Sequence, residues 1–212
     1  MKNLKNHFGK LAIIILALGF LTSQTGCTPP PPPPPPPAPC VTTGTDFQTL
    51  YTNTLALSSA YNNYTTMDLV THEYTFFIST NKTVCSIGYQ GNANLFTASI
   101  PYTIEIYDNT NSMLVYSGNH VFNSAFTDYV TPTAPINLTA GNSYTIKRKA
   151  VNYLGNIGNT IGRICRFSNS PAPPVVPYPV NFGIMTITAS NFYGTGGPVP
   201  NYGIPYIDIV FQ

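Results

Sequence analysis

The stretch "PYTIEIYDNTNSMLVYSG", residues 101–118, gives the clearest indication of fold class in this chain. Its apolar side chains alternate with Thr103, Glu105 and Tyr107, and a period of two residues is typical of a strand with one buried and one solvated face. The polar run Asn-Thr-Asn-Ser that follows predicts a hairpin turn into a second strand. We therefore interpret this stretch as an antiparallel β-hairpin.

The rest of the chain favours an all-β domain, because only 8% of its 212 residues are charged and helical surfaces usually draw on Glu, Lys and Arg. Runs of β-branched and aromatic residues predict further strands over 74–80, 83–89, 144–153, 162–168, 181–190 and 205–211. Together they predict an antiparallel, jelly-roll-like β-sandwich of about eight or nine strands over residues 73–212. Residues 41–72 are expected to be a leader of short strands or turns that packs on the sandwich, without a helix.

The first 26 residues have the pattern of an export signal. Three lysines precede the apolar run "LAIIILALGFL" (11–21), which is shorter than the roughly 20 residues needed to span a bilayer. The run ends in Gly26–Cys27 and so resembles a bacterial lipoprotein signal. That resemblance implies that the Cys27 thiol is lipidated and becomes the mature N-terminus of an envelope protein, anchored in the outer membrane. Ordinary cleavage and secretion is the alternative, and the side of the membrane is left open.

A proline-rich spacer follows Cys27 and fills residues 27–40 of the predicted organisation. Nine consecutive prolines (29–37) precede Ala38 and Pro39, and proline favours a stiff polyproline II rod. At about 3.1 Å per residue the rod would hold a domain roughly 35 Å from the lipid. The alternative use is a docking segment for an SH3-like or WW-like partner.

Several strands of the mature region resemble a bacterial family of β-sandwich domains of unknown function. The segments that carry the resemblance are "SIGYQGN" (86–92), "YTIEIYDNTNSMLVYSG" (102–118), "PINLTAGNSYTI" (135–146) and "NYGIPYIDIVF" (201–211). The family occurs in secreted and cell-surface proteins, often beside polysaccharide-acting modules. The resemblance therefore implies a sandwich fold and a carbohydrate context, although this chain lacks tryptophan, so an indole platform for sugars is not expected.

Three cysteines remain beyond Cys27, in what should be an oxidising compartment. The alternation within their strands places Cys85 and Cys165 on core-facing sides, which favours a Cys85–Cys165 disulfide with Cys40 left over; two buried free thiols are the alternative. The spacing does not suit a zinc site, and we expect no metal and no cofactor.

Two sets of residues are candidates for ligand binding. Five of the six basic residues after Cys27 fall within positions 147–166, on strands expected to be neighbours, so that Lys147, Lys149 and Arg166 would contribute to a basic patch for anionic polysaccharide or lipid headgroups. A solvated strand face is the plainer interpretation. The loop over 190–203 carries Phe192, Tyr193 and Tyr202, whose rings could stack on sugars or pack on their own domain.

The sequence predicts a binding protein more readily than an enzyme or a nucleic-acid-binding protein. From Cys27 onward there are six basic and seven acidic residues, so charge does not favour nucleic acid. No catalytic motif is found, and Asp208 is expected to pair with a basic residue of a neighbouring strand. We therefore expect a non-catalytic binding or adhesive module with a glycan ligand. The alternatives are a structural or assembly component that contacts another envelope protein and, less favoured, a polysaccharide-acting enzyme.

Overall fold

The computed structural model describes residues 31–34, 36, 38–65, 70–150, 162–167, 176–194 and 198–212, so the predicted signal and Cys27 lie outside the described residues. The chain divides into two units, Met1–Pro36 and Pro37–Gln212, and the second contains the folded domain. The described prolines of the first unit are exposed and belong to no helix or strand. No described helix is long and apolar enough to cross a bilayer.

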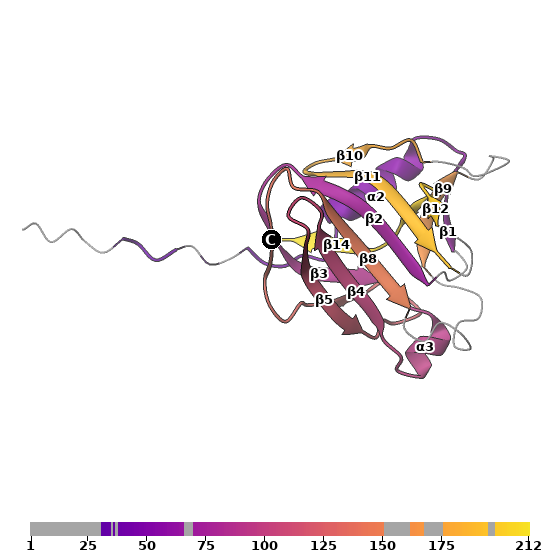
Figure 1. Cartoon of the computed structure of the whole chain (residues 1–212), viewed down its shortest axis with the longest axis horizontal. Coiled ribbons are helices and arrows are strands. Elements are labelled where there is room, and N and C mark those ends of the chain that lie inside the picture. Colours follow the sequence, from indigo (N-terminus) through magenta and orange to yellow (C-terminus); the bar gives the residue numbers. More distant parts are fainter. Residues whose placement is uncertain are drawn as a thin grey trace, which may run out of the picture. The chain divides into compact units, whose positions relative to one another are not determined.

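A large antiparallel sheet forms one layer of the domain (Figure 1). The predicted hairpin of residues 101–118 is confirmed as β4 (Tyr102–Asp108) and β5 (Met113–His120), which pair at one side of this sheet. β12 (Val199–Pro200) pairs with β11 (Met185–Tyr193). Across the sheet the strand order is β10 (Val180–Phe182), β11 (Met185–Tyr193), β2 (Thr71–Ile78), β8 (Tyr144–Ala150), β4 (Tyr102–Asp108) and β5 (Met113–His120).

Two smaller antiparallel sheets make up the opposing layer. The first is formed by β14 (Asp208–Phe211), β3 (Lys82–Tyr89), β6 (Asp128–Val130) and β7 (Ile136–Leu138); the second by β1 (Tyr61–Thr65), β9 (Arg163–Phe167) and β13 (Ile204–Pro205). The described residues thus contain fourteen strands, several of only two or three residues, where eight or nine were predicted.

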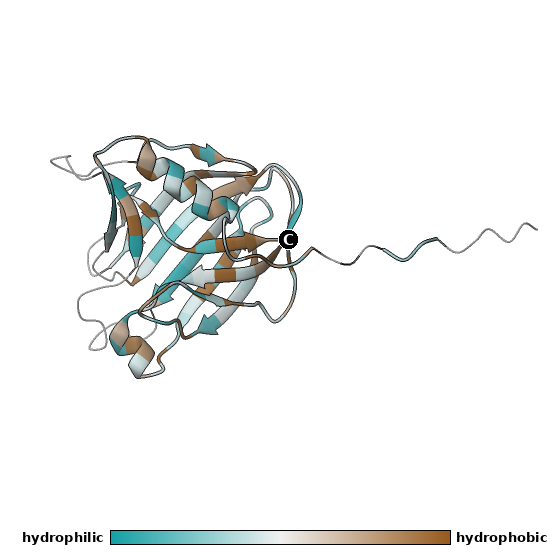
Figure 2. Cartoon of the chain, turned by 180° about the vertical axis from the view of Figure 1, so that it is seen from behind, coloured by the Kyte–Doolittle hydropathy of each residue, from teal (hydrophilic) through white to brown (hydrophobic). Residues whose placement is uncertain are grey.

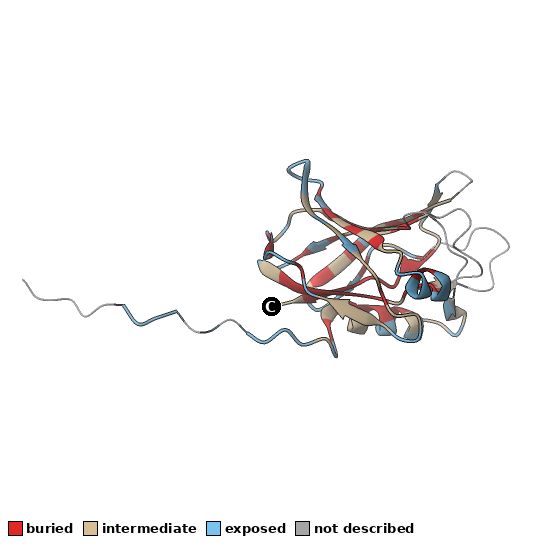
Figure 3. Ribbon diagram, turned by 90° about the horizontal axis from the view of Figure 1, so that it is seen from below, coloured by how far each residue is buried: buried red, intermediate tan, exposed pale blue. Residues whose placement is uncertain are grey.

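The core lies between these layers and confirms the predicted antiparallel β-sandwich. Tyr74, Phe76 and Ile146 of the large sheet share one buried cluster with Ile87 and Ile209 of the opposing layer. Figure 3 shows the buried residues gathered between the layers. Burial of these side chains stabilises the fold by about 25 cal/mol per Å² of apolar surface removed from water.

The expectation of a helix-free leader is wrong, because α2 spans Asp46–Ala56. Thr45 caps it by accepting a hydrogen bond from the backbone N–H of Gln48 at 3.0 Å. Phe47, Leu50 and Tyr51 face the core, and the helix packs against β10 and β14. Figure 2 shows α2 in front of the large sheet when the domain is seen from behind. A second short helix, α3, spans Ala93–Thr97.

The predicted Cys85–Cys165 disulfide is also wrong, since Cys85 is bonded to Cys40 and Cys165 is a buried free thiol. The register of β14 on β3 passes from Val210↔Ser86 to Phe211↔Val84 and leaves Cys85 as the extra residue of an irregularity. Strict alternation therefore fails at this position. The bridge fastens the start of the folded unit to β3, with Cα atoms 5.8 Å apart.

Candidate functional site

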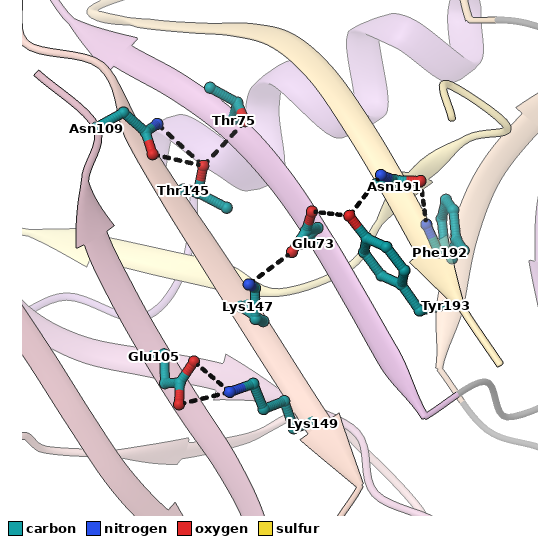
Figure 4. Close-up of polar contacts among 10 residues, drawn as sticks. All are labelled: Glu73, Thr75, Glu105, Asn109, Thr145, Lys147, Lys149, Asn191, Phe192 and Tyr193. Carbon is teal, nitrogen blue, oxygen red and sulfur yellow. Dashed lines mark hydrogen bonds and ion pairs between the residues drawn. The ribbon is translucent and has the colours of Figure 1, made fainter. Parts of the chain in front are cut away.

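The solvent-facing side of the large sheet carries a continuous set of polar side chains, which we call the outer sheet face (Figure 4). It arises from the alternation in β2, β8 and β4, where every second residue is buried in the core and the residues between point outward. The set consists of Glu73, Thr75, Glu105, Asn109, Thr145, Lys147, Lys149, Asn191 and Tyr193.

Both lysines of the outer sheet face are paired with glutamates. Lys147 lies opposite Glu73 on neighbouring strands, with Nζ 3.1 Å from Oε2, and Lys149 Nζ lies 2.7 Å from both carboxylate oxygens of Glu105. The charges on this face are therefore balanced. The predicted basic patch is therefore wrong, because both lysines are paired with acids. It is also wrong because β9, which carries Arg166, pairs with β1 and β13 rather than with β8.

Tyr193 is held at the edge of this charged row by two hydrogen bonds. Its hydroxyl donates to Glu73 Oε1 at 3.1 Å and accepts from Asn191 Nδ2 at 2.7 Å. Burial and the nearby Glu73 carboxylate raise the pKa of the Tyr193 phenol, so the hydroxyl keeps its proton as a donor at neutral pH. The ring is thus oriented on the sheet before any ligand arrives.

A second polar row crosses the same face one step further along the strands. The hydroxyls of Thr75 and Thr145 lie 3.0 Å apart, and Asn109 Nδ2 donates to Thr145 Oγ1 at 3.0 Å. Phe77 follows Thr75 on β2 and is 37% exposed, while Tyr107 pairs with Thr145 and is 38% exposed. The outer sheet face therefore offers aromatic rings next to fixed donors and acceptors.

Arg166, Tyr202 and Tyr64 form a separate group, which we call the arginine cluster. The Arg166 guanidinium carbon lies 3.9 Å from the centroid of the Tyr64 ring and 5.4 Å from that of Tyr202, and its Nη1 donates to the Tyr202 hydroxyl. The Tyr202 ring meets Phe192 edge-on, with centroids 6.0 Å apart. The structure thus brings together two of the predicted residues and adds Tyr64, which was missed.

Phe192 is not available to a ligand, because it is 1% exposed and its ring packs 5.0 Å from that of His72. The predicted loop over 190–203 is in part strand, since β11 extends through Tyr193 and pairs with β12. Phe192 and Tyr193 therefore point to opposite sides of the large sheet, and the six predicted binding residues do not share one concavity.

Behind Phe192, a charged side chain is fully buried. Arg148 Nη2 lies 2.8 Å from His72 Nδ1, and the guanidinium lies 5.2 Å from the centroids of both Tyr89 and Tyr102. A guanidinium can only donate, so His72 Nδ1 is the acceptor and Nε2 carries the ring proton. Burial and the Arg148 charge lower the pKa of His72 well below its usual value.

Asp208 is buried as well, but it does not pair with a basic residue of a neighbouring strand as expected. Its carboxylate accepts hydrogen bonds from the Thr45 hydroxyl at 2.8 Å, from Gln48 Nε2 at 2.8 Å and from the Tyr129 hydroxyl at 2.7 Å. Burial raises its pKa despite these donors. The contacts join α2 to β14 and β6, and Asp208 is completely buried, which together indicate a structural role.

Sequence reasoning missed the carboxylates and amide that complete the outer sheet face. Glu73 and Glu105 both lie directly opposite Lys147 on adjacent strands, so acid and base in alternating positions of neighbouring strands was a usable signal. Asn191 and Tyr64 had no such signal, since their roles depend on which distant strands meet. Among the described residues, no three His, Cys, Asp or Glu side chains are grouped to hold a metal ion.

These features define an antiparallel β-sandwich with a charge-balanced polar sheet face. No protein-family model matches the chain, and a search of curated proteins finds no match to it.

Proposed function

We propose that this protein is a bacterial envelope lipoprotein, anchored through Cys27, whose β-sandwich binds a glycan on the outer sheet face without catalysing a reaction. The observation that carries the proposal is the row formed by Tyr193, Glu73, Lys147, Glu105 and Lys149, in which a tyrosyl ring adjoins fixed donors and acceptors. Sugars offer apolar ring faces for stacking and hydroxyls that both donate and accept, which is the combination found here.

On this face the geometry favours an extended chain that presents uncharged sugar units over a small molecule. A sheet face is open, and successive outward residues of a strand lie about 6.6 Å apart, which suits repeated contacts along a polymer. Because both lysines are balanced by glutamates, this face lacks the net charge that would attract an anionic polysaccharide.

The binding proposal is tested with the whole mature protein on a panel of envelope and host polysaccharides at about 1 mM, followed by titration of variants. Tyr193→Ala and Glu73→Gln should each weaken binding at least tenfold. Phe96→Ala, which removes an exposed ring from α3, is the matched control and should bind normally. No binding by the parent protein, or equal binding by Tyr193→Ala, would remove the proposal.

The anchor is tested separately, in cells fed a labelled fatty acid. Cys27→Ser should abolish incorporation of the label and release the protein from the membrane fraction. An unlabelled parent protein that fractionates like Cys27→Ser would instead support ordinary secretion.

A second candidate function, contact with another envelope protein, is favoured by strand β5. It ends the order of the large sheet, contains no charged residue and exposes Met113 and Leu114. An uncharged edge strand can accept a further strand from a partner. Cross-linking from residues replaced by cysteine on β5 in intact cells would capture a protein partner under this alternative and none under glycan binding alone.

A further inference from the structure

The arginine cluster differs from the outer sheet face because its cation has no acidic partner within the part of the chain that the structure describes. The described ion pairs join Lys147 and Lys149 to glutamates, and among the described residues no carboxylate lies within ion-pair distance of Arg166. Its guanidinium is instead held against the Tyr64 ring at 3.9 Å. An aromatic ring contacts the face of a guanidinium, so the N–H groups at its edge can still donate hydrogen bonds to a ligand.

The hydrogen-bonding groups of the cluster are donors. Arg166 Nη1 donates to the Tyr202 oxygen, so the phenolic hydrogen of Tyr202 is directed elsewhere and is itself available to donate. Arg166 Nε is buried and has no acceptor among the described residues. Because the guanidinium can only donate and already donates to the Tyr202 oxygen, the groups that remain for a ligand favour one that accepts hydrogen bonds.

Backbone packing fixes the cluster in place. Asn201, with φ of +56°, makes reciprocal contacts with Ser190 of β11: its backbone N–H donates to the Ser190 carbonyl at 2.8 Å, and its side-chain oxygen accepts from the Ser190 N–H at 3.1 Å. Gly203 then lets the chain approach β9, since a Cβ there would lie 2.7 Å from the Cys165 carbonyl oxygen. Tyr202 lies between Asn201 and Gly203, and these two contacts hold it beside Arg166.

We propose that Arg166, Tyr202 and Tyr64 form a binding site for an oxyanion carried on the glycan, a carboxylate or a phosphate substituent. The guanidinium and the Tyr202 hydroxyl bind the oxygens, and the Tyr64 ring, which is 45% exposed, supports the adjoining sugar. The inference rests on the proposed function for the identity of the carrier, but it concerns a site separate from the outer sheet face.

The test uses the whole mature protein and three probes: tetragalacturonic acid, its neutral methyl ester and inorganic phosphate. The parent protein should bind the acid at least tenfold more tightly than the ester, and this preference should shrink as salt rises. Arg166→Gln should abolish it, while Lys82→Gln, which removes a cation from β3, should leave it intact. Phosphate binding that is lost in Arg166→Gln, without preference for the acid, would support the same site with a phosphate substituent.

Two further variants keep the result independent of folding. Arg166→Lys retains the charge but not the planar fork, and Tyr202→Phe retains the ring but not the hydroxyl; each should unfold at a temperature close to that of the parent and bind the acid at least fivefold more weakly. Binding of the acid or of phosphate that is equal in the parent and in all Arg166 variants, or absent from the parent, would overturn the inference. Loss of neutral-glycan binding in Tyr193→Ala reports on the outer sheet face alone, so the two proposals can fail separately.

Discussion

Arg148 donates a hydrogen bond to His72 across neighbouring strands, 2.8 Å from Nη2 to Nδ1, and both side chains are completely buried. The contact holds His72 neutral, because a protonated imidazole would place a second positive charge beside the guanidinium. The aromatic rings of Tyr89, Tyr102 and Phe192 surround the pair. His72 is thus a buried group whose protonation is linked to the stability of the fold.

Stability should therefore fall as the pH drops below about 6.5. The pKa of His72 is lower in the folded protein than in the unfolded chain. Below the unfolded pKa the unfolded chain therefore takes up a proton at this imidazole that the folded protein does not, and the free energy of unfolding falls. Between pH 7.5 and pH 5 the free energy of unfolding should fall by about 2 kcal/mol through this group. Urea unfolding of His72→Gln should show a flatter pH dependence than the parent protein.

The matched control for that experiment is His120→Gln. Burial lowers the pKa of His120 too, but its ring is half-buried and hydrogen-bonded to the Tyr116 hydroxyl at 2.6 Å, so its share of the pH dependence should be smaller. A His72→Gln protein as pH-sensitive as the parent would show that His72 is not the titrating group.

The Cys40–Cys85 bridge should be the disulfide of the mature protein. It closes a span of 45 residues, so Cys40→Ser should lower the free energy of unfolding by up to about 4 kcal/mol, the value that the chain-entropy model gives for a loop of this length. Burial raises the pKa of the Cys165 thiol to about 12, and it should stay unreactive until the protein unfolds. Non-reducing peptide mapping that links Cys85 to Cys165 would contradict this pairing.

Asp208 should matter for stability rather than for binding. Asp208→Asn replaces one acceptor oxygen by a donor facing Thr45, Gln48 and Tyr129, at a cost of about 1–3 kcal/mol. Asp46→Asn, in the first turn of α2, is the control and should cost less than about 1 kcal/mol. Chemical denaturation measures both, and equal effects would argue against a special role for the buried carboxylate.

Gly203→Ala should disturb the arginine cluster without replacing any of its side chains, since the added Cβ would also lie 3.3 Å from Arg166 Cβ. The added Cβ meets the backbone of Cys165, which cannot move aside easily, so a loss of about 1–3 kcal/mol and a displaced Tyr202 are expected. Gly141→Ala, at φ of +79° with open space around it, tests backbone conformation alone. A Gly203→Ala protein that is as stable as the parent and keeps its oxyanion binding would show that close approach to β9 is not required.

Local patterns in the sequence predicted most of the fold. The alternation in residues 101–118 identified the β4–β5 hairpin and the outward positions of Glu105 and Tyr107. The helix α2 was missed although Phe47, Leu50, Tyr51 and Thr54 follow helical spacing, because a chain so poor in charged residues argued against any helix.

The site was harder to predict, because it depends on which strands meet. The assumption that β8 and β9 are neighbours joined Arg166 to Lys147, whereas the structure places them in different sheets. An irregularity of one residue at Cys85 likewise interrupts the alternation from which a bond to Cys165 was predicted, and Cys85 is bonded to Cys40. Long-range pairing and single-residue bulges leave little trace in one sequence.

The most direct test of glycan binding on the outer sheet face is an NMR titration of the mature domain with the tightest-binding oligosaccharide of the panel. The account predicts that the largest amide shifts fall at Glu73, Lys147 and Tyr193, with small shifts along α2. Shifts that fall mainly on α2 or along the β5 edge, with those three residues unchanged, would contradict it.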